Sequence, residues 1–227
     1  MILAKNYLEK LPKSQLLDLA KFVVTENFKH HSDNQFPENY KDDINAIYEE
    51  ELSYYENSEV FTSKDATGAI LGSIRVLKWN FTDVLPLQKI FGINPLLAIS
   101  TPDVNSIYHI GRFAIKKDVR DLNLFKGLLA CVSKLICSHH NNIAFAECDS
   151  KLLRILKLLG VKAKIIGTSI NYLGSETIPI SLSYEGVIDF YTENKHLVDK
   201  VLKKSTDVYK LPKSVAFNAL EHNYSLV

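Results

Sequence analysis

The first candidates for chemistry are a histidine and two arginines on segments that are predicted to be strands. His109 and Arg112 lie in Ser106–Ile115, and Arg75 lies in an earlier strand. A neutral histidine can take a proton from an incoming ammonium, and an arginine can bind a carboxylate through two hydrogen bonds. Because side chains alternate along a strand, His109 and Arg112 would face opposite sides of an ideal strand, and a bulge near Gly111 would be needed to turn both into one cleft.

Structural interpretations of the same residues are also open. His109 could be a partly buried histidine that hydrogen-bonds to the neighbouring strand. The two arginines could form structural salt bridges, because a long cation is seldom placed in a central strand without a partner. The carboxylates in question are Glu147, Asp42 and Asp43.

A cluster of basic side chains lies where the strand that ends at Ile115 leads into a predicted helix at residues 122–140. The whole chain carries 27 basic and 26 acidic residues and a net charge of +1, so this local excess stands out. The first turn of a helix offers free N–H groups and the positive end of the helix dipole, which favours a pyrophosphate or phosphate. An ordinary solvated loop is the alternative. The basic residues are Lys116, Lys117, Arg120 and Lys126.

Composition narrows the class of protein. The 227 residues are 46% hydrophobic and 23% charged, which is typical of a globular chain that can bury one full core. The near-neutral charge argues against a nucleic-acid partner. We expect a cytoplasmic protein, because there is no signal-peptide layout, no apolar run of about 18 residues and no CxxC pair. Cys131, Cys137 and Cys148 are expected to be buried thiols, although Cys148 beside His109 could also act as a nucleophile.

The elements that must position these residues alternate between helices and strands. Hydrophobic periodicity predicts helices at residues 14–28, 40–55, 122–140, 150–159 and 187–202, and strands at 60–62, 69–79, 106–115, 143–148, 161–173 and 177–184. We expect Ser14 to cap the first helix and Pro179 to place the last strand at an edge or a bulge. Trp79 and the apolar segment 81–97 could line a tunnel or belong to the core.

This order of elements predicts a mixed α/β sheet of the α+β kind, with helices on both faces. We expect one domain over residues 1–185, in which the N-terminal helices at 14–56 cap the sheet. A C-terminal helical extension and tail would follow over residues 186–227, with the tail starting at Ser205.

The basic turn resembles the signature of the GNAT acyltransferases. In that family an arginine or glutamine, two residues, a glycine, one residue and a glycine or alanine precede an apolar helix and bind the pyrophosphate of coenzyme A. The register places Arg120 at the arginine, and Asn123 and Phe125 at the two glycines. Because both glycines are replaced, the resemblance points to a subgroup of the family.

The subgroup resembles the acyl-homoserine-lactone synthases and N-acyl amino acid synthases. The stretch His109-Ile-Gly-Arg112-Phe113-Ala-Ile sits where these enzymes carry Glu-x-Ser-Arg followed by Phe or Leu, and Gly72-Ser-Ile-Arg75 resembles their Gly-x-x-Arg-Leu strand. The likeness extends over roughly residues 60–184. His109 replaces the usual glutamate and the glycine after Ile110 replaces the usual serine.

The resemblance implies a GNAT-like twisted central sheet in which parallel strands at 107–115 and 143–148 diverge at one end. It implies an enzyme, an N-acyltransferase, that moves a long acyl chain from acyl carrier protein or acyl-CoA to the amine of an amino acid or a related small amine. No cofactor would be bound permanently and no metal is expected. The alternatives are a catalytically inactive GNAT-fold binding or scaffold protein, and a homoserine-lactone-type signal synthase.

The resemblance also assigns roles to residues. His109 and Arg112 would be catalytic, and Arg75 and Tyr172 would bind the acceptor. Leu156 stands where many acetyltransferases have a general-acid tyrosine, so Tyr172 is a distant substitute. The expected partners are acyl carrier protein and the small amine, and a lipid product would allow peripheral contact with a membrane. The acyl-phosphopantetheine donor would bind Phe113, Ala114, Ile115, Arg120, Leu122, Asn123 and Lys126, with a backbone N–H of 113–115 holding the oxyanion.

Overall fold

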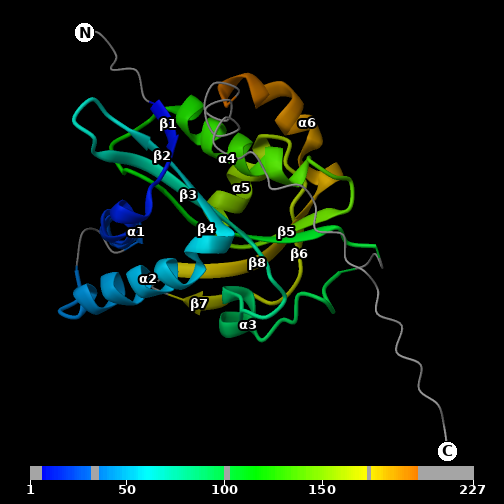
Figure 1. Cartoon of the computed structure of the whole chain (residues 1–227), viewed down its shortest axis with the longest axis horizontal. Helices are drawn as coiled ribbons and strands as arrows, with labels where there is room; N and C mark the ends of the chain where they lie inside the picture. The colour runs from blue at the N-terminus through cyan, green and yellow to red at the C-terminus, as the bar shows by residue number, and fades with distance from the viewer. Residues whose placement is uncertain (1–6, 32–35, 100–102, 173–174, 199–227) are drawn as a thin grey trace, which may run out of the picture.

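The computed structural model describes residues 7–31, 36–99, 103–172 and 175–198 (Figure 1). Over these residues the strands form one eight-stranded sheet in the order β1-β2-β3-β4-β5-β8-β6, with β7 also paired to β8. The strands are β1 (Tyr7–Lys10), β2 (Ser58–Lys64), β3 (Ile70–Lys78), β4 (Ser106–Ile115), β5 (Asn142–Asp149), β6 (Lys164–Ile165), β7 (Ile170–Tyr172) and β8 (Ser175–Ser183). The helices are α1 (Leu16–His31), α2 (Tyr40–Tyr54), α3 (Pro86–Phe91), α4 (Leu122–Ile136), α5 (Ser150–Leu158) and α6 (Tyr184–Asn194), with 3-10 turns at Lys13–Gln15, Tyr55–Asn57 and Lys195–Leu197.

Helices cover both faces of the sheet. In Figure 1, α2 and α3 lie below the sheet while α4, α5 and α6 lie above it. The apolar side chains of α4, α5 and α6 form the largest core cluster with one face of the central strands. Side chains of α1 and α2 pack with Val60 of β2 on the other face, next to a cluster formed around α3. The predicted mixed α/β sheet with helices on both faces is confirmed.

The strands β4 and β5 separate at one end. They are parallel neighbours, and their pairing runs from Ser106 opposite Asn142 to Ile110 opposite Ala146. Beyond Ile110, β4 continues to Ile115 beside β3, whereas β5 continues beside β8. Paired strands leave no opening between them, but β4 and β5 are no longer paired beyond Ile110 and Ala146. The predicted divergence is therefore confirmed, and it creates a gap in the middle of the sheet.

Several element boundaries differ from the sequence-based predictions. Ser14 does not cap α1, because it lies inside the 3-10 turn that precedes this helix and follows Pro12. The helix predicted at 122–140 ends at Ile136. The last helix begins at Tyr184, where the Ser183 side chain accepts the N–H of Gly186, and it ends at Asn194. The tail predicted from residue 205 lies outside the described residues.

The region predicted as one strand at 161–173 forms the two short strands β6 and β7. Pro179 of β8 lies opposite the break between them, and β8 is not an edge strand, since β5 pairs with its other side. Ile166 N–H donates to the Pro179 carbonyl, so the proline ring nitrogen also faces the interrupted side. The missing N–H of Pro179 therefore falls where the outer ladder is already broken.

The predicted domain boundary near residue 185 stays a prediction. Val187 and Phe190 of α6 are buried in the same core cluster as α4, and so is Val198 after it. Residues 187–198 thus pack against the sheet domain. Within the described residues, no helix is long and apolar enough to cross a membrane.

Candidate active site

A bulge in β4 brings the predicted site residues to one face. Ser73 lies opposite Ala114 and Arg75 lies opposite Gly111, so β4 has one more residue than β3 between these pairs. Arg112, inside this bulge, has a φ of 53°, a left-handed conformation that non-glycine residues seldom adopt. The bulge expected near Gly111 is present, and it turns the Arg112 side chain toward α2.

Arg112 and Arg75 are bound by two adjacent glutamates of α2. Arg112 Nε donates to Glu51 Oε1 at 2.7 Å and its Nη2 donates to Glu50 Oε2 at 2.5 Å. Arg75 Nη1 donates to the same Glu51 oxygen at 2.6 Å, and both of these side chains are fully buried. The structural salt bridge is therefore formed, and its partners are Glu50 and Glu51.

Neighbouring opposite charges keep Arg112 and Glu50 ionised. Burial by itself would lower the pKa of Arg112, but the carboxylates of Glu51 and Glu50 outweigh it and raise the pKa. Burial would likewise raise the pKa of Glu50, and the cations, Arg112 first, hold it below its ordinary value. Arg112 is already paired with these two glutamates. The carboxylate of an acceptor would have to compete with them to bind Arg112.

His109 is hydrogen-bonded through both ring nitrogens. Its Nδ1 lies 3.2 Å from Arg75 Nη2, and its Nε2 lies 2.9 and 3.1 Å from the two carboxylate oxygens of Glu147. A guanidinium can only donate, so Nδ1 must accept, and this network assigns the imidazole proton to Nε2, which donates it to Glu147. The neutral ring has no lone pair left for an ammonium. These contacts argue against the predicted role of His109 as the group that takes the proton directly.

A pocket of about 410 Å³ is lined by residues from both faces of the sheet, among them residues beside the gap between β4 and β5. Side chains from α1, α2 and α3 on one face and from α4 and α5 on the other face line it, which the separation of the two strands makes geometrically feasible. One half is polar and contains His109, Arg112 and Glu147. The other half is apolar and is lined by Ile110, Phe125, Leu129, Leu152, Leu156, Ile180 and Leu182.

Glu147 is the residue that the sequence analysis did not place in the site. It is the first residue of β5 beyond the last β4–β5 pair, and its side chain is 12% exposed. The sequence named Glu147 only as a possible salt-bridge partner for Arg75 or Arg112, because a long cation in a central strand needs a partner. The alternation of side chains could have placed it in the site. Phe145 and Glu147 point to the same face of β5, and Phe145 pairs with His109, so Glu147 lies on the same face of the sheet as His109.

Comparison with known proteins was made at the level of sequence and of structure. No protein-family model matches the sequence, and no curated protein matches it. In structure the chain is similar to FeeM, an N-acyl amino acid synthase from uncultured soil microbes, with a TM-score of 0.59 and 13% identity over 85% of this chain and 98% of FeeM. It is also similar to BjaI, a CoA-dependent acyl-homoserine lactone synthase solved with SAM and isopentyl-CoA, with a TM-score of 0.55 and 15% identity over 86% and 89% of the two chains.

A third similar structure is a GNAT-family acetyltransferase from Staphylococcus aureus, with a TM-score of 0.51 and 12% identity over 79% of this chain and 99% of the other. The chain has a GNAT-like fold. The predicted resemblance to GNAT acyltransferases and to their acyl-homoserine-lactone and N-acyl amino acid synthase subgroup is thus confirmed at the level of the fold.

The predicted donor site of this GNAT-like fold contains a carboxylate. Asp121 caps α4, and its side chain accepts the backbone N–H groups of Asn123 and Leu124. Two of the amides that a pyrophosphate would use are therefore already bonded to an acid. Leu122 and Asn123 are exposed beside this cap, and Arg120 is exposed before it.

The basic turn is also tied to α1. Lys117 N–H donates to Glu26 Oε2 at 2.8 Å, and Lys117 Nζ donates to the Lys29 carbonyl at 2.6 Å. His30 Nε2 lies 2.9 Å from the Ile115 carbonyl. Lys117 therefore serves the loop's own structure, and Arg120 and Lys126 are the better placed cations for a phosphate.

Backbone N–H groups of β4 face the gap. Lys116 N–H donates to the Leu71 carbonyl of β3, so by alternation the N–H groups of Phe113 and Ile115 point away from β3, while that of Ala114 points toward it.

Phe113 lines the pocket and packs edge-on against Phe125 of α4, with ring centroids 5.0 Å apart. Phe125, at a glycine position of the GNAT signature, thus fills part of the cleft.

Two more predicted residues lie on the pocket wall. Tyr172 of β7 lines the pocket and is 42% exposed, so it can reach a ligand. Cys148 also lines it, and burial raises the pKa of this thiol to about 12. A thiol with that pKa is protonated near neutral pH, which disfavours it as a nucleophile.

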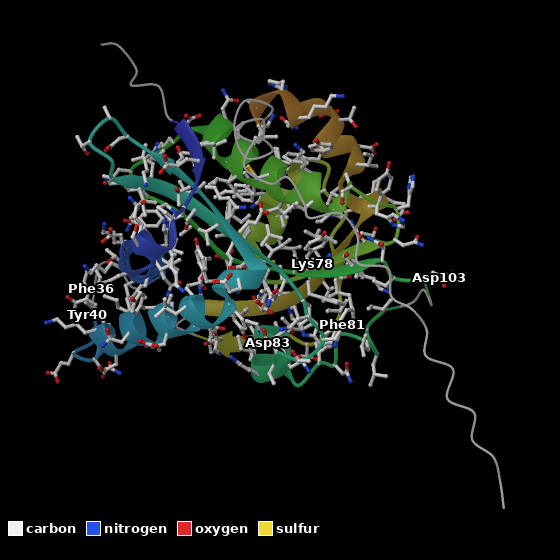
Figure 2. The ribbon with its side chains drawn as sticks, viewed as in Figure 1. Phe36, Tyr40, Lys78, Phe81, Asp83 and Asp103 are labelled. Carbon is white, nitrogen blue, oxygen red and sulfur yellow. The ribbon has the colours of Figure 1, made fainter. Side chains whose placement is uncertain are left out.

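Trp79 and the segment 81–97 were predicted either to line a tunnel or to belong to the core, and most of this region belongs to the core. Trp79 is buried with Tyr54 and Leu77, and its ring contacts Phe81 at a centroid distance of 4.9 Å. Figure 2 shows Phe81 and Asp83 in the turn before α3, where Phe81 is 58% exposed. From this segment Pro86, Lys89 and Ile90 line the pocket.

Proposed function

We propose that this chain is an N-acyltransferase that moves a long-chain acyl group from a phosphopantetheine thioester to a small amine. The observation that carries the proposal is the pocket at the gap between β4 and β5, which is lined by apolar side chains on one face of the sheet and includes His109, Arg112 and Glu147 on the other. A thioester at the gap would have its acyl chain among apolar side chains and its carbonyl beside ionisable groups. The similarity of the fold to those of FeeM and BjaI supports the same proposed activity.

Three parts of the pocket have separate tasks in this proposal. The apolar wall around Leu129 and Leu152 holds the acyl chain. The N–H groups of Phe113 and Ile115 are the candidates to stabilise the oxyanion that forms when the amine attacks. Tyr172 and the polar half receive the acceptor.

Acyl carrier protein is the preferred donor in this proposal, and acyl-CoA is the alternative. The Asp121 carboxylate at the start of α4 repels the several phosphates of CoA more strongly than the single phosphate of a carrier-bound arm. Arg120 and Lys126 remain near this helix end as surface cations for the acidic carrier. BjaI was solved with isopentyl-CoA, so both donors belong in the test.

An amino acid is the proposed acceptor. Its carboxylate would be held by Arg112 in competition with Glu50, or by Lys89, which is 51% exposed and lies 3.8 Å from Glu50. A lactone signal made from SAM is the second candidate, because the chain is also similar to BjaI. The inactive scaffold is not favoured, since a carboxylate and an open pocket remain at the gap. Cytoplasmic location and peripheral membrane contact through a lipid product are further parts of this proposal.

The experiment is product formation with defined donors and acceptors. The protein is incubated with acyl carrier protein or CoA carrying chains of different length, plus amino acids, other amines or SAM, and acylated products are sought by mass spectrometry. Leu152→Trp should block the pocket and lower product formation by at least tenfold, mainly for the longer chains. Leu158→Trp on the exposed side of α5 is the matched control and should leave it unchanged. Absence of product with every donor and acceptor would refute the proposed function.

A further inference from the structure

We infer that Glu147, supplied by β5, is the general base of the reaction, and that His109 and Arg75 position it. This inference rests on the proposed function and goes beyond it by naming the group that receives the proton of the amine. His109 of β4 lies beside the gap and brings no carboxylate to it. The carboxylate is found instead on the neighbouring strand.

The location of Glu147 fits this role. The last hydrogen-bonded pair between β4 and β5 is Ile110 and Ala146, so Glu147 stands at the point where the two strands begin to separate. It lines the pocket, and its side chain is 12% exposed, whereas that of His109 is 1% exposed. Of this bonded pair, Glu147 is therefore the member that a substrate in the gap can touch.

The direction of the hydrogen bonds also assigns the roles. Glu51 fixes the Arg75 guanidinium, Arg75 donates to His109 Nδ1, and His109 Nε2–H donates to the Glu147 carboxylate. The chain of donors ends on a carboxylate that retains acceptor capacity, because an ionised carboxylate has about four lone-pair sites. His109 keeps the carboxylate oriented and transfers no proton itself.

Proton and bond changes balance with Glu147 as the base. The amine arrives as an ammonium and gives one proton to the carboxylate of Glu147. The free amine attacks the thioester carbonyl, so that a C–N bond forms and the C–S bond breaks. The second proton of the nitrogen goes to the leaving sulfur, which departs as a thiol, and Glu147 releases its proton to solvent. The products are an amide and a free phosphopantetheine thiol.

Glu147→Gln tests the base directly, since it keeps the size of the side chain and removes its basicity. We expect kcat to fall by about a hundredfold or more, with the KM for the acyl donor changed less than threefold. Glu176→Gln makes the same replacement on an exposed glutamate of β8 and should behave as the parent protein. Circular dichroism and the urea midpoint establish that each variant is folded, and Glu147→Asp provides a second variant that retains a carboxylate.

Two replacements of His109 separate positioning from proton transfer. Gln can accept one hydrogen bond from Arg75 and donate one to Glu147, whereas Leu can do neither. We expect His109→Gln to keep kcat within about tenfold of the parent and His109→Leu to lose about a hundredfold or more. Equal large losses in both folded variants would make His109 the base and overturn the inference.

The outcomes distinguish this inference from the proposed function. If the parent protein forms acylated amines and Glu147→Gln forms them at a similar kcat, the N-acyltransferase proposal stands and the inference is overturned. If the parent forms no product with any donor and acceptor, both fail. If Glu147→Gln is inactive while Glu147→Asp and His109→Gln retain partial activity, the assignment of Glu147 is supported.

Discussion

The guanidinium of Arg75 lies directly over Gly111 on the neighbouring strand. A Cβ atom added to Gly111 would come within 2.9 Å of Arg75 Nη2, closer than such atoms approach in proteins. Arg75 has little freedom to move away, because it is buried and is held by Glu51 and His109. The path of Arg75 therefore explains why residue 111 is a glycine.

Gly111→Ala should destabilise the fold by about 1–3 kcal/mol, as overpacking of a filled interior does. Urea unfolding followed by circular dichroism measures this change. In an Arg75→Lys background the same replacement should cost less, because a lysine lacks the Nη2 atom that the new methyl group meets. An equal cost in both backgrounds would contradict the proposed clash.

Arg112→Met should destabilise the fold, because Glu50 and Glu51 both lose their hydrogen bonds with Arg112, although Glu51 keeps Arg75 and Glu50 keeps Lys89 nearby. Removal of one member of a buried ion pair destabilises a fold by roughly 3–5 kcal/mol. Because the Arg112 side chain is 16% exposed, we expect a loss near the lower end of that range. The cost should be smaller in a Glu50→Gln background, and a double-mutant cycle in urea gives the coupling. Additive effects of the two changes would mean that the pair is not coupled in solution.

The Glu50 carboxyl should make stability depend on pH in the acidic range. Its pKa is lowered from the ordinary value of 4.5, so the unfolded chain binds this proton more readily than the folded one. The free energy of unfolding therefore rises with pH here, and this contribution is complete above the unfolded pKa and lost as pH falls through the folded pKa. Glu50→Gln should flatten the profile below about pH 4.5 relative to the parent, and an unchanged slope would contradict the shift.

Asp121→Ser should strengthen the binding of coenzyme A. Serine still caps α4, but it removes the negative charge from the helix end where phosphates would approach. We expect a roughly two- to fivefold lower Kd by calorimetry at low salt, with less gain at high salt. Asp118→Ser removes an exposed acid from the same loop without touching the helix cap, and it should have a smaller effect. Equal gains in the two variants would mean that the cap plays no special part.

The three cysteines should resist alkylation in the folded protein. Burial raises the pKa of Cys131 and Cys148 to about 12 and that of Cys137 to about 11. At pH 8 about one Cys148 thiol in ten thousand is a thiolate, which is the reactive form. Mass spectrometry after iodoacetamide treatment should find these thiols unmodified, with rapid modification in urea. Fast labelling of Cys148 in the folded chain would restore it as a candidate nucleophile.

Local periodicity was sufficient for most of the helices and strands. The sequence predicts the strand Ser106–Ile115 and the helix that follows it, because apolar residues recur there at the spacing of each element. It failed over 161–173, where β6 and β7 are separate. Those residues pair with β8 around Pro179, so contacts distant in sequence decide where each short strand begins and ends.

The candidate site also depends partly on local sequence and partly on tertiary packing. The sequence by itself placed His109, Arg112 and Arg75 on strands of one sheet, because residue type and periodicity indicate those strands. A bulge near Gly111 was needed only if His109 and Arg112 share a cleft, and the tertiary structure shows that bulge. The partners of these residues were decided by tertiary structure. Glu50 and Glu51 lie some 60 positions before Arg112, and Glu147 lies 38 positions after His109. Only the packing of α2 on the sheet and the parallel register of β4 with β5 bring those carboxylates within hydrogen-bonding distance, and that packing determines which way each proton is donated.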